Sequence, residues 1–205
     1  MQGYIIRINP CRDEDLLVTI LTRNHIQTSY RFYGARHSTI NLGYKIDAEL
    51  IHSTKSKLPQ LRNILHLSHK WQHQRDKMLL WQNFIALFYE HLKGVEQIDE
   101  FYFTLLDEVA QKMHKQNPKR LQIEAYAKLL EHEGRLHLDQ KCFLCEKDIK
   151  KDLTLARAYL PAHGECLHSS PIDPTKIKYF FTKKSTLLLD DELVDKLWDV
   201  MLEGF

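Results

Sequence analysis

The chain has 205 residues, of which 43% are hydrophobic and 27% are charged, so it can form one or two globular domains with a sizeable core. Seven glycines and six prolines argue against long disordered or collagen-like tracts. No apolar run approaches the ~18 residues that span a bilayer, and the start lacks the pattern of a secretory signal, so we expect a cytoplasmic protein without a membrane partner.

Charge is unevenly distributed along the chain. The net charge is only +2, but the first 70 residues contain ten Lys or Arg and five Asp or Glu. No acidic residue occurs from Leu16 to Ile46. A basic first third joined to a slightly acidic remainder indicates an anionic partner, such as a nucleic acid, for the front of the chain.

Short strands are predicted in the first 70 residues. The stretches contain β-branched and aliphatic residues, and several alternate between apolar and polar positions. Four or five such strands in about 70 residues are typical of a small closed barrel, of which the five-stranded OB-fold is one. The expected strands are 4–8, 16–22, 26–34, 44–52 and 61–67, the last of which could also begin a helix.

The stretch SYRFYGARHST, residues 29–39, combines aromatic and basic side chains. Strand alternation predicts that Tyr30 and Phe32 enter the core while Arg31 and Tyr33 face outward. Gly34 then ends the strand and a basic turn follows. Exposed cations contact phosphates and aromatic faces stack on unpaired bases, so this pattern suits a platform for single strands.

From about residue 71 onward the apolar spacing becomes helical. We expect a helical domain over 71–205, after a barrel domain over 1–70. Pro118 fits the first turn of a helix, Gly134 fits a helix end, and Asp190 or Asp191 fits a cap. The predicted helices are 76–94, 98–116, 118–134 and 187–204.

A cluster of cysteines and histidines interrupts the helices at about 139–170. Cys142 and Cys145 form a C-x2-C pair, and after seventeen intervening residues His163 and Cys166 form an H-x2-C pair. Two such pairs match a tetrahedral structural zinc site. His168 is the alternative fourth ligand, and core cysteines without metal are the alternative to the whole site. An H-x-E pattern occurs here, but its order relative to C-x-x-C is wrong for a zinc deaminase.

Together these segments resemble the RecO family of recombination-mediator proteins, particularly the short versions from epsilonproteobacteria. The resemblance lies in DEDLLVTILT (13–22), YGARHS (33–38), CFLC (142–145) and HGEC (163–166). It implies an α+β protein with an N-terminal OB-fold and a helical domain carrying a zinc-finger-like loop with structural zinc. The sequence departs from the family at His163, a position that is commonly cysteine.

The resemblance also implies a non-enzymatic, nucleoid-associated role in DNA repair. Such proteins bind single- and double-stranded DNA, anneal strands, bind a RecR partner and help load recombinase onto DNA coated by single-strand binding protein. Arg36 matches the arginine of the family's G-A-R motif, which implies a DNA contact. Charge and strand parity add three further expected DNA contacts: Arg31, His37 and Lys45. Arg12 is expected to join them, because it lies in a loop that can reach the same face.

Three other functions stay open at this point. OB-folds and zinc knuckles also bind RNA. A protein-protein scaffold would suit a weak basic face. An enzyme is disfavoured because the chain has neither a phosphate-binding glycine loop nor a nucleophile elbow.

Overall fold

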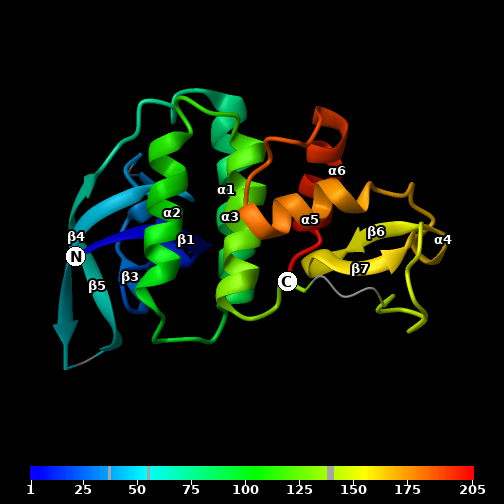
Figure 1. The fold of residues 1–205 in the computed structure, drawn as a ribbon. Helices are drawn as coiled ribbons and strands as arrows, with labels where there is room; N and C mark the ends of the chain where they lie inside the picture. Colours follow the sequence, from blue (N-terminus) through cyan, green and yellow to red (C-terminus); the bar gives the residue numbers. More distant parts are fainter. Residues whose placement is uncertain (37, 55, 138–140) are drawn as a thin grey trace. The chain divides into compact units, whose positions relative to one another are not determined.

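The computed structural model describes residues 1–36, 38–54, 56–137 and 141–205 (Figure 1). The chain divides into two compact units, Met1–His114 and Lys115–Phe205. Strands give way to helices near residue 70, yet the first two helices belong to the same compact unit as the strands. The unit that contains the barrel therefore continues well past its last strand.

Five strands of the first unit close into a barrel, as the sequence predicts. Their order is β1-β2-β3-β5-β4, and β1 closes the ring by pairing with both β2 and β4. β3 and β5 run parallel where Tyr30 lies opposite Gln60. This is the architecture of an OB-fold. The strands are β1 (Gln2–Pro10), β2 (Leu16–Leu21), β3 (Ile26–Arg31), β4 (Lys45–Ser53) and β5 (Ser56–His66).

The barrel interior is apolar. In β4 the predicted alternation is confirmed, since Ile46 and Ala48 are buried while Glu49 is exposed. Each fully buried aliphatic side chain of this kind stabilises the fold by about 1.5–3 kcal/mol relative to exposure. The buried cluster consists of Ile5, Leu16, Val18, Ile20, Ile40, Ile46, Ala48 and Leu61.

The predicted parity of β3 is wrong. Ser29 lies opposite the core residue Val18 and is fully buried, so the β3 residues that share its parity face the barrel interior. Tyr30 therefore faces outward, and Phe32, just beyond the strand, is 44% exposed. The pairing register with β2 sets this parity. Aliphatic side chains of β2 already fill this part of the interior, which leaves room for the small side chain of Ser29. The Tyr30 hydroxyl donates to the Asp15 carboxylate, outside the barrel interior.

Two helices complete the first unit, α1 (Arg75–His91) and α2 (Glu100–Lys112). Buried indoles hold them in place. Nε1 of Trp81, on α1, donates to the carbonyl of Gly43 at 2.8 Å. Gly43 has φ +81°, and an added Cβ would lie 2.7 Å from the Trp81 ring, so glycine is required there. This contact ties α1 to the strand connection between β3 and β4.

The second unit contains the remaining helices and a small hairpin. Asn117 caps α3 by accepting from the backbone N–H of Lys119 at 3.0 Å, and Gly134 ends the helix with φ +67°. Asp190 caps α6, as one of the two predicted alternatives. The elements are α3 (Pro118–His132), β6 (Leu153–Ala156), β7 (Leu160–His163), α4 (Gly164–Leu167), α5 (Pro174–Lys183) and α6 (Asp191–Leu202).

The β6–β7 hairpin and α5 were not predicted from the sequence. Each strand of the hairpin has only four residues, which is too short for an alternating pattern to stand out. α5 begins at Pro174 after the capping residue Asp173, whose carboxylate accepts from the N–H of Thr175 at 2.8 Å. That start signal lies directly after the predicted cysteine and histidine stretch at about 139–170.

Candidate functional site

Four side chains in the second unit lie together as a potential metal centre. They are the predicted set Cys142, Cys145, His163 and Cys166, and their ligand atoms all lie within 4.8 Å of one another. Ligands of a tetrahedral zinc ion, with Zn–S of about 2.3 Å, are spaced by about 3.8 Å. Small adjustments of the side chains would therefore place all four around one ion.

The first pair is held by a tight turn. The N–H of Glu146 donates to the carbonyl of Cys142 at 2.8 Å, and the N–H of Cys142 donates to the carbonyl of Lys147 at 2.9 Å. Glu146 adopts φ +61°, a conformation that glycine would adopt more easily. The turn directs both thiols to one side, which is how a C-x2-C pair binds a metal.

The second pair joins a strand end to a short helix. His163 is the last residue of β7, and Cys166 follows on α4. Gly164 stands between them in a crowded position, where an added Cβ would lie 2.5 Å from the carbonyl oxygen of Ser169 and 2.6 Å from the Asp152 carboxylate. Asp152 also accepts from the N–H of Glu165 at 3.1 Å, and so fixes the start of α4.

The two ring nitrogens of His163 have different partners. Nδ1 lies 3.3 Å from Sγ of Cys145 and 3.9 Å from Sγ of Cys166, so it faces the cluster. Nε2 lies 3.3 Å from the backbone carbonyl of Asp148. Metal-bound histidines usually donate their second ring N–H to such an acceptor, which fixes the ring orientation. His168, the alternative ligand, is the C-cap of α4 and is not part of the cluster.

The cluster favours a thiolate at one position. Burial raises the pKa of the Cys142 thiol, but backbone N–H groups of Cys145, His163 and Leu144 outweigh burial and lower that pKa to about 6. For Cys166, burial and the neighbouring thiols raise the pKa to about 11. Three sulfurs and one imidazole suit zinc, which binds thiolate and imidazole together in closed structural sites.

In the first unit, Asp15 joins the two turns that carry the predicted DNA-binding residues. Asp15 is 8% exposed and follows η1 (Arg12–Glu14), the turn between β1 and β2. Its carboxylate accepts from the Tyr30 hydroxyl and, at 2.6 Å, from the backbone N–H of Tyr33. The hydrogen bond to Asp15 raises the pKa of Tyr30 to about 12. The turn 11–15 and the segment after β3 are therefore held side by side.

Arg36 and Tyr33 form an exposed basic and aromatic pair on this side of the barrel. Arg36 ends η2 (Gly34–Arg36), its side chain is 64% exposed, and its Nε forms an ion pair with Glu14. Its guanidinium lies 5.2 Å from the centre of the Tyr33 ring, which is itself exposed. Arg12 is exposed on the adjoining turn. These residues were expected to face an anion, and the structure places them on one surface.

The other expected DNA contacts have different surroundings. Arg31 is half-buried, and its Nη1 donates to the carbonyl of Leu61 at 3.1 Å. Lys45 is 15% exposed and pairs with Asp107 at 2.5 Å, beside the Tyr4 ring. The Lys45–Asp107 pair is largely shielded from solvent, unlike the exposed Arg36–Glu14 pair, and we therefore leave Lys45 out of the interface proposed below. His37 lies outside the described residues.

Two cations that the sequence analysis did not single out lie further along the outer face of β2 and β3. A groove of about 600 Å³ is lined by Thr19 and Thr28, whose hydroxyls are 3.1 Å apart, together with Lys57 and Lys93. Both lysines are exposed. Lys57 belongs to the basic first third of the chain, but Lys93 follows α1 and reaches the barrel only through tertiary packing.

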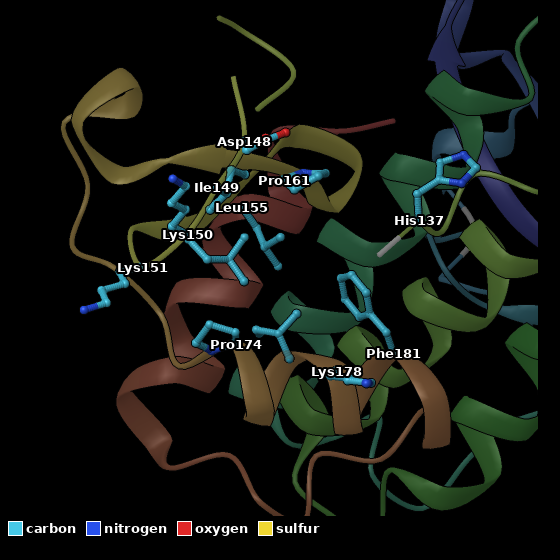
Figure 2. A pocket seen from close by; sticks show the side chains of 12 residues that line it. His137, Asp148, Ile149, Lys150, Lys151, Leu155, Pro161, Pro174, Lys178 and Phe181 are labelled. Atoms are coloured by element: carbon cyan, nitrogen blue, oxygen red, sulfur yellow. The ribbon is translucent and has the colours of Figure 1, made fainter. Parts of the chain in front are cut away.

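The second unit has a groove of about 620 Å³, and Figure 2 shows side chains that line it. Its apolar lining includes Leu155 and Pro161 from the hairpin and Phe181 from α5. Lys150 and Lys178 also line it, both are exposed, and neither has an ion-pair partner among the residues described here. The groove therefore combines an apolar floor with positive charge. Sequence patterns did not indicate it, because its sides come from two elements that were not predicted.

A comparison with known protein families gives a match over the barrel. Residues 1–72 match the family model described as RecO N terminal, so the chain begins with a RecO-like N-terminal domain. This match covers the barrel and ends just before α1. No curated protein matches the chain. Among the described residues, no helix is long and apolar enough to cross a membrane.

Proposed function

We propose that this protein is a non-enzymatic DNA repair and recombination mediator. It binds single- and double-stranded DNA through its barrel, anneals complementary strands and works with a RecR-type partner to load recombinase onto coated DNA. The observation that carries the proposal is the exposed pair Arg36 and Tyr33, held beside Arg12 on a RecO-like N-terminal domain. This role is exercised in the cytoplasm, at the nucleoid.

The DNA path in this proposal follows the outer face of β2 and β3. OB-folds bind oligonucleotides across these strands, between the loops that flank them. Arg12 and Arg36 lie at one end of that face, and Lys57 and Lys93 border the groove further along it. Cations spaced along one face suit a phosphate backbone, and binding of this kind weakens steeply as salt rises.

The test is fluorescence anisotropy of a labelled single strand across a salt series. Wild type is expected to bind with a steep dependence on salt, and Arg36→Ala is expected to reduce the slope by about one. Arg157→Ala, an exposed arginine of the second unit, is the matched control and should leave the slope unchanged. Absence of binding at low salt would favour a scaffold, and stronger binding to a matched RNA strand would favour the RNA-binding alternative.

The groove in Figure 2 supports a second part of the proposal, the contact with single-strand binding protein. Its apolar floor suits a hydrophobic side chain, and Lys150 and Lys178 suit acidic residues beside it. An acidic peptide with an apolar end has this complementary chemistry. The acidic tail of a single-strand binding protein is such a peptide.

A peptide-binding experiment tests this contact. A labelled peptide with three aspartates followed by an apolar, aromatic-ended stretch is expected to bind wild type, and Lys150→Glu with Lys178→Glu is expected to weaken binding at least tenfold. Lys112→Glu with Lys128→Glu changes the same charge elsewhere and should leave binding within a factor of about two. Equal loss in both double variants would show a general charge effect and would contradict the assigned groove.

A further inference from the structure

A groove at the end of the β3–β5 pairing has the composition of a pocket for an unpaired base. β3 ends at Arg31, whereas β5 continues to His66, so the strands part after Tyr30 and Gln60. The resulting hollow has a volume of about 440 Å³, within the roughly 300–1,000 Å³ of ligand sites. Its lining includes Arg31, Phe32, Thr39, Arg62 and Asn63.

Phe32 supplies an aromatic surface in this groove. Its side chain is 44% exposed, although a phenylalanine gains stability from burial. The ring is held by an edge-to-face contact with Tyr30, with ring centres 4.7 Å apart and planes at 69°. Tyr30 is in turn fixed by its hydrogen bond to Asp15. Phe32 is therefore exposed and oriented, which is what stacking on a base requires.

The polar groups of the groove are suited to the edges of a base and to a phosphate. Nε of Arg31 is buried and has no hydrogen-bond partner within the part of the chain that the structure describes, while Nη1 of the same side chain donates to the Leu61 carbonyl. A buried donor without an acceptor costs free energy that a ligand oxygen would recover. Asn63 donates to Glu49 at 2.6 Å, which leaves its carbonyl oxygen to accept. Arg62 is exposed and adds a second positive charge.

We infer that this groove binds one unpaired nucleobase of a DNA strand, and that Phe32 stacks on it. The inference rests on the proposed function, and it states how the barrel distinguishes single-stranded from double-stranded DNA. A base inside a duplex has its faces covered and its edges paired, so it cannot enter such a pocket. Phosphate contacts bind both forms of DNA, whereas the groove favours the single strand.

Anisotropy with a labelled poly-dT strand and a duplex of equal length tests the inference at one salt concentration. Phe32→Leu keeps an apolar side chain but removes the aromatic ring. It is expected to weaken single-strand binding about 5- to 100-fold, the range of one lost stacking contact, and to leave duplex binding unchanged. Phe32→Tyr is expected to restore single-strand binding. Phe143→Leu, which alters a phenylalanine of similar exposure in the second unit, should change neither.

Two results would overturn the pocket while leaving the proposed function intact. One is an equal loss of single-strand and duplex affinity in Phe32→Leu, and the other is no loss in either. A strand of abasic sites adds a check on the unmodified protein, which should bind it more weakly than poly-dT. If wild type binds no DNA at low salt, the proposed function itself fails and the pocket with it.

Discussion

At the scale of single residues, Asp15 holds the stretch 29–39 in place. Its carboxylate accepts from the Tyr30 hydroxyl and from the backbone N–H of Tyr33, and only the first of these contacts needs a tyrosine. Arg36 can then remain exposed on the turn that follows. The buried position of Asp15 gives it a structural role.

Replacing Asp15 with Asn is expected to destabilise the protein by about 2 kcal/mol. Asn is neutral and accepts through only one oxygen, so one of the two donors loses its acceptor and the other keeps only a neutral one. Urea unfolding followed by circular dichroism measures the change. Asp13→Asn is the matched control, because Asp13 is exposed on the same turn, and its effect should stay below about 0.5 kcal/mol. Equal effects of the two variants would contradict the assigned role of Asp15.

At the scale of elements, the cysteine and histidine pairs compensate for the small size of the hairpin. β6 and β7 have four residues each, and a two-stranded hairpin alone is marginally stable in water. We propose that zinc, bound by Cys142, Cys145, His163 and Cys166, joins the turn at 142–147 to the end of β7 and to α4. Binding free energy at such a site acts directly as folding free energy.

Removing one thiol is therefore expected to affect the second unit selectively. Cys142→Ser should lose its zinc by elemental analysis and lower the melting temperature of the second unit by several degrees, while the barrel still binds DNA. Cys11→Ser, which removes an exposed cysteine outside the cluster, should retain one zinc per chain and its melting temperature. Wild type without zinc, or an unchanged melting temperature in Cys142→Ser, would contradict the structural metal.

At the scale of the whole molecule, two half-buried histidines link the stability of the first unit to pH. Burial lowers the pKa of both His66 and His69, and Nε2 of each is buried without a hydrogen-bond partner in the described structure. His66 stacks on Tyr44, and His69 stacks on Trp71. Protonating either ring in the folded state would place a charge in a partly desolvated position.

Stability of the first unit is expected to fall as the pH drops below about 6.5, the ordinary pKa of histidine. Below that pH the unfolded chain binds protons that the folded protein binds only at lower pH, so the free energy of unfolding decreases until the folded pKa is passed. Urea unfolding at pH 7 and pH 5 measures the effect. Tryptophan fluorescence in a Trp198→Phe background reports the first unit, because Trp71 and Trp81 both belong to it.

His69→Gln is expected to make the pH dependence shallower. His52→Gln, at an exposed position in the same unit, is the control and should leave it unchanged. If the free energy of unfolding depends on pH equally in wild type and His69→Gln, the loss of stability at low pH comes from other groups, for example carboxylates.

The sequence by itself determined the elements that depend on interactions between residues close together in the chain. Alternation predicted the strands, Pro118 and Gly134 predicted the ends of α3, and the spacing of the two ligand pairs identified the four residues that cluster. Local patterns suffice in these cases because caps, turns and C-x2-C knuckles act over a few residues.

The tertiary structure alone decided which face each residue occupies and which distant residues meet. Pairing with β2 set the parity of β3, and so reversed the expected positions of Tyr30 and Arg31. Packing brought Asp107 to Lys45 and largely shielded the pair from solvent. The groove in Figure 2 and the one beside Phe32 lie between elements that are separate in sequence. Such features depend on register and packing between segments, and no local pattern encodes them.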